Sequence, residues 1–150
     1  MTPSIRQATE ADLPAVLNLY AQPDMDKGHT LSIGQAQQLL QTFAHYPSYR
    51  LFVASTPTQH EQIVGSYALL VMHNLAHRGT PSAIVEDVVV ATAYQRQGVG
   101  RAMMQHAKNL AQAAGCYKLV LSSNLRRAQA HAFYRSLGFE QHGLSFRMEL

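Results

Sequence analysis

The sequence predicts an α+β domain built on a mixed, mostly antiparallel β-sheet with helices on both faces. Between residues 49 and 73, two β-branched and aromatic runs are joined by a polar turn, which predicts an antiparallel hairpin. Between residues 82 and 122, an apolar run, a helical stretch and a second apolar run follow one another. Two strands joined by a helical crossover run parallel in one sheet, so the sheet has one central β-α-β crossover.

A strand and a helix open the chain. Residues 4–9 alternate as a short strand, and residues 10–21 carry apolar side chains at helical spacing. The first residue of this helix stays open, because Thr9 and Asp12 both suit a cap and Pro14 suits a first turn.

The second helix has a clearer start. Ser32 followed by Gln35 forms a capping box, in which each residue satisfies a backbone donor beside the other. One apolar stripe follows, made of Ile33, Ala36, Leu39, Leu40 and Phe43.

The remaining elements follow from changes of hydrophobic period. Strands are expected at 49–55, 62–73, 82–91 and 118–122, helices at 98–114 and 127–137, and two last strands within 139–150 around Gly143. Gly138 is expected to end the last helix. The predicted order is therefore βααβββαβαββ.

Composition indicates one globular domain spanning residues 1–150, with 47% apolar and 14% charged residues. The net charge of +3 favours an anionic ligand but is too small to predict nucleic-acid binding. The single cysteine, Cys116, indicates a reducing compartment. Neither a signal peptide nor a membrane-spanning run is present, so a cytoplasmic protein without membrane contact is expected.

A glycine turn, QRQGVGR (95–101), lies between the strand at 82–91 and the helix after it. First-turn amides lack intrahelical partners, and glycine lets a ligand approach the backbone, so the turn predicts a phosphate or pyrophosphate site with Arg96 and Arg101 at its rim. No Gly-Lys-Ser/Thr follows, which excludes a nucleotide P-loop, and Met103 disfavours a dinucleotide fingerprint. The alternative is a tight turn that holds no ligand.

Two motifs resemble those of the GNAT N-acetyltransferases. Gln-x-x-Gly-x-Gly after a buried strand resembles their acetyl-CoA signature, and NLRRAQAHAFYRSLGF (124–139) resembles their second signature. EDVVV (86–90), YQRQGVG and GCYK (115–118) are similar to the glucosamine-6-phosphate N-acetyltransferases, whereas SSNLRR stands where that group carries acidic residues. The resemblance implies a GNAT fold, acetyl-CoA as co-substrate, no metal, and direct attack by an amine without an acyl-enzyme.

The resemblance also implies a set of cofactor-binding residues. Backbone groups of Val88, Val89 and Val90 would pair with the pantetheine arm, and the amide of Val89 or Val90 would polarise the thioester carbonyl. The pyrophosphate would lie on the backbone of Gln95, Arg96, Gln97, Gly98, Val99, Gly100 and Arg101. Asn124 aligns with an asparagine near the CoA arm, and a helix cap is its alternative.

Two side chains are the catalytic candidates. Tyr134 matches the tyrosine of the Phe-Tyr motif of the GNAT enzymes, and the resemblance implies that it protonates the departing CoA thiolate. Packing in the core is the alternative role of Tyr134. Glu86, at the head of the central strand, is the candidate general base, acting through water, because a buried carboxylate can have a raised pKa. Strand alternation points Asp87 to the opposite face. For both carboxylates the alternative is a structural role.

Other polar residues are weaker candidates. His131 shares a helix face with Tyr134, and the loop with His73 and His77 would border the acceptor. Arg126 and Arg127 suit either a phosphate of CoA or a solvated helix start. No histidine spacing predicts zinc, and packing is the better explanation of Cys116, Met103 and Met104.

The sequence therefore predicts an acetyl-CoA-dependent N-acetyltransferase acting on a primary amine of a small molecule, such as an amino sugar, an amino-acid-like amine or an antibiotic-like amine. The alternative is a non-catalytic acyl-CoA-binding sensor. A transfer-RNA acylator is disfavoured because no basic stripe tracks a phosphate backbone. A homodimer is possible, with HGLSFRMEL (142–150) contributing an edge strand.

Overall fold

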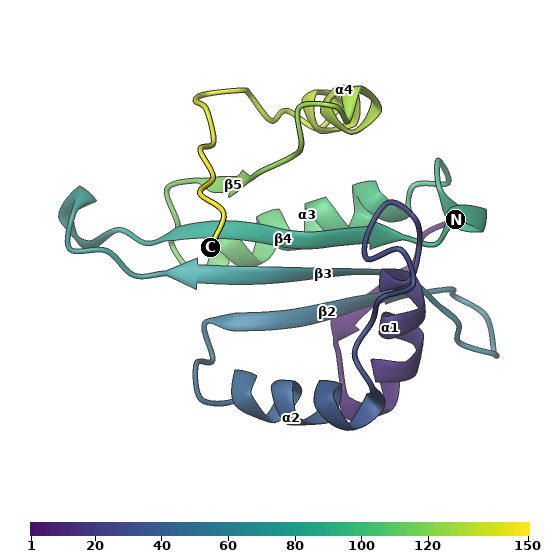
Figure 1. Cartoon of the computed structure of the whole chain (residues 1–150). Helices are drawn as coiled ribbons and strands as arrows, with labels where there is room; N and C mark the ends of the chain where they lie inside the picture. The colour runs from purple at the N-terminus through teal and green to yellow at the C-terminus, as the bar shows by residue number, and fades with distance from the viewer. The chain divides into compact units, whose positions relative to one another are not determined.

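A five-stranded sheet of order β1-β2-β3-β4-β5 forms the centre of the fold (Figure 1). The computed structural model describes all of residues 1–150, which form two compact units, Met1–Val120 and Leu121–Leu150. The strands are β1 (Ser4–Gln7), β2 (Tyr49–Ser55), β3 (Ile63–Met72), β4 (Ser82–Val90) and β5 (Leu119–Leu121).

The direction of the strands matches the prediction. The first three pairings are antiparallel. Beside β5, Tyr117 N–H donates to the Pro81 carbonyl and Ala83 N–H donates to the Lys118 carbonyl, both at 3.0 Å. The paired residue numbers rise together on the two chains, as they do only in a parallel pair. The mixed sheet with one β-α-β crossover is therefore confirmed.

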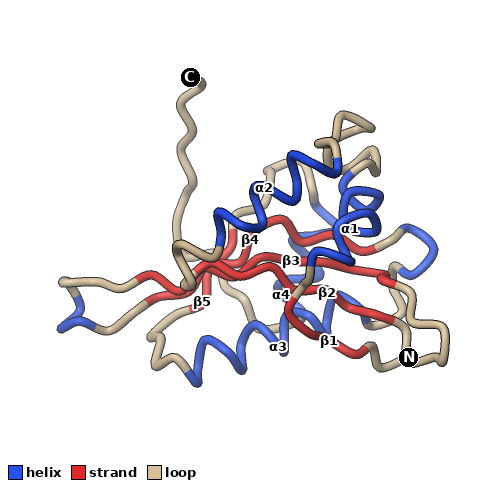
Figure 2. The backbone as a smooth tube through the Cα atoms, turned by 90° about the horizontal axis from the view of Figure 1, so that it is seen from below, coloured by secondary structure: helices blue, strands red, loops and turns tan.

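Helices cover both faces of the sheet in the first unit. Figure 2 shows α1 (Leu13–Tyr20) and α2 (Ile33–Phe43) on one side of the strands and α3 (Val99–Ala113) on the other. On the α1 face, Val16 belongs to a buried cluster with Leu51, Val53 and Ala68. We call this side the α1 face below.

The helix starts are fixed by local polar contacts. Thr9 precedes a 3-10 turn over Glu10–Asp12, and Asp12 precedes α1, so both predicted caps lie at helix starts. The capping box of α2 is confirmed, because Gln35 N–H donates to Ser32 Oγ at 3.2 Å and Ser32 N–H donates to Gln35 Oε1 at 3.0 Å.

On the opposite face, α3 packs closely on β3 because β3 contains a glycine. A Cβ on Gly65 would lie 3.0 Å from Val99 Cγ1 and 3.1 Å from Met103 Sδ, which is closer than side chains normally approach. Farther along α3, Nδ1 of His106 lies 2.6 Å from the hydroxyl of Tyr67, which is fully buried. This histidine therefore serves the packing of the sheet.

Apart from Leu121, the last residue of β5, the second unit contains one helix and no strand. Helix α4 (Ala128–Ser136) ends before Gly138, whose φ of +92° suits glycine, as predicted. The two strands expected within 139–150 are absent, so that prediction was wrong. Alternating apolar residues can form a strand only beside a partner strand, and this unit offers none. The alternating residues are instead exposed, namely Leu144, Phe146, Met148 and Leu150.

No helix in the structure combines the length and the hydropathy needed to cross a membrane. The assignment of residues 1–150 to a single domain stays a prediction.

Candidate active site

The glycine turn leaves backbone donors without partners at the start of α3. Gly98 is the N-cap, with φ of +91° and no side chain to accept from the helix. The first intrahelical bond runs from Ala102 N–H to the Gly98 carbonyl at 3.0 Å. The amides of Val99, Gly100 and Arg101 therefore precede every possible intrahelical acceptor. Together with the helix dipole, they form a site for an anion.

Two glutamines tie this turn back to the residues that precede it. Gln95 Nε2 donates to the Val90 carbonyl at 3.2 Å, and Gln97 Nε2 donates to the Ala93 carbonyl at 2.8 Å. Between them, Arg96 has a φ of +63°, a conformation that costs a non-glycine residue free energy. The side chains at 95 and 97 thus hold the turn. The Gln95 amide itself donates to the Thr92 carbonyl at 3.4 Å, so the amides that stay available are those of Val99, Gly100 and Arg101.

The end of β4 presents its backbone alternately to β3 and away from it. Ala91 N–H donates to the Val64 carbonyl at 2.8 Å, which makes Val90 and Gly65 a pair without mutual hydrogen bonds. The N–H and C=O of Val90 consequently point away from β3, whereas those of Val89 point toward it. The Val90 carbonyl accepts from Gln22 Nε2 at 3.2 Å as well as from Gln95.

A β-bulge at Asp87 overturns the prediction that Asp87 and Glu86 face opposite sides. The pairing of β3 with β4 shifts between Ser66 and Ala68, and Asp87 has a φ of +53°. An inserted residue of this kind breaks the alternation of a strand. Glu86 pairs with Ala68 and so lies on the α1 face, and the charge of Asp87 acts on Tyr20 and Tyr49, which pack on that face.

Both carboxylates hold their protons more tightly than usual. Partial burial, followed by the negative charge of Asp87, raises the pKa of Glu86. Partial burial, followed by the charge of Asp26, raises the pKa of Asp87. None of the ion pairs in the structure includes any of these three carboxylates. A carboxylate with a raised pKa and no cationic partner suits proton transfer.

The second unit positions Tyr134 on α4. The Tyr134 ring packs against Phe133 and Phe139, with centroids 5.2 and 5.8 Å away. Burial raises the pKa of the Tyr134 phenol, and the charge of Arg127 opposes the change. The hydroxyl is therefore protonated at neutral pH and is a possible proton donor. The contacts of the Tyr134 ring with Phe133 and Phe139 fit the alternative role in packing as well, so experiment decides between the two roles.

Asn124 organises the turn before α4. Its Oδ1 accepts from Arg126 N–H at 2.9 Å, and its carbonyl accepts from Arg127 N–H at 3.0 Å. The same carbonyl lies 2.8 Å from Nε2 of His131. Asn124 and His131 thus have contacts that explain them structurally. Whether Asn124 also contacts a cofactor stays a prediction.

The other candidates show no organised chemistry. Burial raises the pKa of the Cys116 thiol, which reduces its reactivity. His77 stacks near Tyr117, with ring centroids 4.6 Å apart. No group of three or more His, Cys, Asp or Glu side chains is arranged to hold a metal ion.

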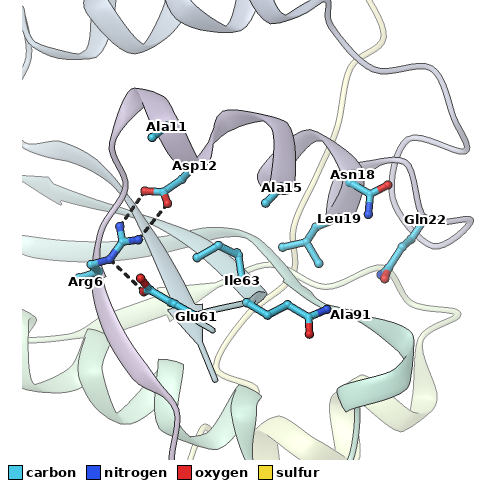
Figure 3. A pocket seen from close by; sticks show the side chains of 11 residues that line it. Arg6, Ala11, Asp12, Ala15, Asn18, Leu19, Gln22, Glu61, Ile63 and Ala91 are labelled. Atoms are coloured by element: carbon cyan, nitrogen blue, oxygen red, sulfur yellow. Dashed lines mark hydrogen bonds and ion pairs between the residues drawn. The ribbon is translucent and has the colours of Figure 1, made fainter. Parts of the chain in front are cut away.

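A surface pocket beside α1 contains none of the predicted site residues (Figure 3). Arg6 crosses it and donates to both carboxylate oxygens of Asp12, at 2.7 and 2.9 Å, and to Glu61 at 3.3 Å. Arg6 is the only positively charged side chain that lines the pocket, and it is already paired with Asp12 and Glu61. We therefore infer that this cluster stabilises the fold.

Sequence patterns missed three residues that shape this region. Gln22 links the segment after α1 to the end of β4, because its Oε1 also accepts from Thr92 N–H at 3.1 Å. Asp26 lies in the same segment, and Gly65 sets the closeness of α3 to the sheet. No periodicity or motif marks Gln22 or Asp26. Gly65 offered a signal, since glycine inside a strand often marks a close approach.

Comparison with known proteins finds related acetyltransferases. The sequence profile described as "Acetyltransferase (GNAT) domain" matches residues 47–141. The chain is 30% identical to an aminoglycoside N(6')-acetyltransferase type 1 of Stenotrophomonas maltophilia, across 99% of this chain and 94% of that protein. It is 33% identical to a glucosamine 6-phosphate N-acetyltransferase of Trypanosoma brucei brucei, where the match spans only 59% of this chain and 58% of that protein.

A solved structure shares the fold over nearly the whole length. It comes from Agrobacterium tumefaciens str. C58 and is provisionally assigned as an acetyltransferase. The TM-score is 0.88 and the identity 32%, over 98% of this chain and 99% of that chain.

Proposed function

Since the chain belongs to the GNAT acetyltransferase family, we propose that it transfers an acetyl group from acetyl-CoA to a primary amine of a small molecule by direct attack. The observation that carries the proposal is that a carboxylate without a cationic partner and a set of open backbone amides follow one another along the chain. The unpartnered carboxylate Glu86 lies on the strand, and the open amides at the start of α3 follow it.

The turn suits the diphosphate of acetyl-CoA. The amides of Val99, Gly100 and Arg101 have no intrahelical acceptor, and the left-handed Gly98 leaves no side chain in front of them. Arg96 and Arg101 take part in none of the ion pairs and can add positive charge. We assign the remaining predicted residues, Gln95 and Gln97, to holding the turn through their side chains.

The strand suits the pantetheine arm. Within our proposal, the backbone of Val90 faces the arm, because its N–H and C=O groups point away from β3. Val88, which lies beside the bulge, is the second residue that we expect to face the arm. Val89 pairs with Ser66, so its backbone groups bond to β3 and hold this part of β4 in place. The Val90 amide is then the better donor to the thioester carbonyl oxygen, and the Val89 amide the poorer one.

Acetyl-CoA supplies the acetyl group as a thioester, and the transfer replaces its carbon–sulfur bond by a carbon–nitrogen bond to the amine. Two protons must move, one from the ammonium to make it nucleophilic and one to the departing sulfur. Glu86 accepts the first through a water molecule, which its raised pKa favours. Tyr134 donates the second from a phenol that is protonated at neutral pH.

Calorimetric titration with acetyl-CoA, free CoA and NADH tests the anion site. We expect saturable binding of both CoA species and none of NADH. Absence of CoA binding by a folded sample would contradict the proposal and leave residues 95–101 as a tight turn.

Turnover distinguishes an enzyme from a sensor. An amine panel followed by free-thiol release should show catalysis that Tyr134→Phe and Glu86→Gln slow, whereas a sensor would bind acetyl-CoA and release no thiol. Tyr134→Leu separates packing from proton transfer, because loss of stability in Leu but not in Phe reports packing.

A further inference from the structure

Tyr67 lies on β3 opposite the bulge of β4. The residue before Tyr67 pairs with Val89, and the residue after it pairs with Glu86. Tyr67 therefore stands opposite two residues, Asp87 and Val88, as happens at a β-bulge. Its side chain is fully buried on the side of the sheet that α3 covers, because the hydroxyl reaches a residue of that helix. Tyr67 thus connects the bulged part of β4 with α3.

The Tyr67 hydroxyl makes the only hydrogen bond between α3 and the sheet. It lies 2.6 Å from Nδ1 of His106, and none of the other hydrogen bonds of α3 reaches a strand. Burial raises the pKa of the phenol, and burial, followed by the charge of Arg50, lowers the pKa of His106. Both side chains are therefore neutral near pH 7, so the hydroxyl can donate to an unprotonated Nδ1.

Aromatic packing holds the two rings in place. Phe52 stacks on Tyr67 with centroids 5.2 Å apart and an angle of 18° between the rings. The same Phe52 ring meets His106 edge-on at 5.1 Å, and the Arg50 guanidinium lies 5.3 Å from its centre. The hydrogen bond between Tyr67 and His106 is consequently held in one geometry.

Two contacts with β3 locate α3 on the sheet. Near the start of the helix, Val99 Cγ1 lies 3.0 Å from the position of a Cβ on Gly65, which sets how closely the helix approaches. About two turns farther along, His106 bonds to Tyr67. Apolar contacts have no preferred direction, whereas a hydrogen bond does, so the second contact sets the rotation of the helix and its position along the strand.

The proposed cofactor site is divided between β4 and α3. The Val90 backbone groups that point away from β3 belong to the strand, and the open first amides belong to the helix. A ligand that bonds to both needs them in one fixed arrangement, because a displacement of about 1 Å spoils such a site.

We propose that Tyr67 and His106 are positioning residues for acetyl-CoA, and that their hydrogen bond holds the first turn of α3 in place relative to the bulged end of β4. This inference rests on the acetyl transfer proposed above. Neither side chain contributes a group to the ligand, so both act through the backbone that they hold.

Tyr67→Phe tests the inference because it removes the hydroxyl and keeps the ring. We expect the Kd of acetyl-CoA in calorimetric titration to rise about two- to tenfold, since a helix that is not held in one position is competent to bind for only part of the time. KM for acetyl-CoA should rise by the same factor. At saturating acetyl-CoA, kcat should stay within about twofold of the wild type, because the bound ligand restores the arrangement.

Substitutions of His106 show whether the hydrogen bond or the ring volume matters. In His106→Asn, Oδ1 can replace Nδ1 as the acceptor, so the Kd should stay near the wild-type value. His106→Leu offers no acceptor and should match Tyr67→Phe. The double variant of Tyr67→Phe and His106→Leu should bind no more weakly than either single variant, because both changes remove the same bond.

Asp12→Asn is the matched control for lost stability. It breaks a part-buried bond to Arg6 in the same compact unit, and Asp12 contributes nothing to the proposed cofactor site. Urea unfolding ranks all variants by their free energy of unfolding. The control should lose stability and keep the wild-type Kd.

Each outcome has a separate meaning. An unchanged Kd in Tyr67→Phe, an equal rise in Asp12→Asn, or a loss of affinity in His106→Asn as large as in His106→Leu overturns this inference and leaves the proposed acetyl transfer standing. If His106→Leu does not fold, Tyr67→Phe and the control decide alone. If the wild type binds no acetyl-CoA, the proposed function fails, and the inference fails with it.

Discussion

Asp12 and the pair Glu86 and Asp87 are carboxylates of the same compact unit in opposite electrostatic settings. Asp12 accepts two hydrogen bonds from Arg6 and one from the Thr9 amide at 2.7 Å, and these contacts, with the Arg6 bond foremost, lower its pKa. Glu86 and Asp87 have no cationic partner, and burial followed by other carboxylates raises their pKa. A carboxylate held by a cation stabilises the fold, whereas one left among carboxylates is available for a proton or a cation.

Replacing Glu86 by Gln should have the largest effect. Loss of a general base typically lowers kcat by about 10²- to 10⁴-fold, and we expect a fall in this range. In the wild type, kcat/KM should rise as pH increases through a pKa above the usual glutamate range, because only the carboxylate accepts a proton. Rate–pH profiles check both points, and the acidic limb assigned to Glu86 should be missing from the variant.

The control for this experiment is Glu61→Gln, since Glu61 contacts Arg6 in the other carboxylate cluster. It should leave kcat unchanged. Equal losses in both variants would show that the two settings do not differ in chemistry.

Replacing Asp12 by Asn should lower the free energy of unfolding by about 1–3 kcal/mol at neutral pH, because the part-buried Arg6 loses its charged acceptor. The folded-state pKa of Asp12 is lowered, so its contribution is present above the ordinary aspartate pKa and disappears as pH falls through the folded-state value. Urea unfolding at several pH values measures this. The two proteins should converge in acid, and a constant difference would mean that charge is not the cause.

Replacing Asp87 by Asn should have the smallest effect on stability and the opposite sign. The folded-state pKa of Asp87 is raised, so the free energy of unfolding falls as pH rises from the ordinary aspartate pKa through the raised one. The variant lacks this penalty and should be more stable at neutral pH by less than about 1 kcal/mol, since solvent screens the exposed charge. Asparagine also tolerates a φ of +53°. Thermal unfolding at neutral and acidic pH should show the gain only at neutral pH.

Most of the fold could be predicted because its signals are local. The capping box at Ser32 and Gln35 and the stop at Gly138 depend on neighbouring residues alone, and both are confirmed. The expected strands within 139–150 failed because alternation describes a segment and not its partner. The pattern of exposed apolar residues there was real, but no strand lies beside it in the second unit.

The site was less predictable for a related reason. The turn at Gly98 and the carboxylate at Glu86 were visible in the sequence, but the orientation of Asp87 depends on a shift of register against β3. Gln22 anchors the segment after α1 to the end of β4, and its partners, Val90 and Thr92, are far from it in sequence. Such contacts arise only when the sheet is assembled.

The close contact at Gly65 has a genetic consequence. Val99, the residue that a side chain at position 65 would displace, is the first residue of α3, so it carries one of the open amides. Gly65→Ala should therefore weaken cofactor binding. In a selection in which growth depends on the activity, the variant should grow poorly, and a higher cofactor concentration should restore growth. A map of such alleles would extend the anion site into the sheet, to a residue that contributes no group to the ligand.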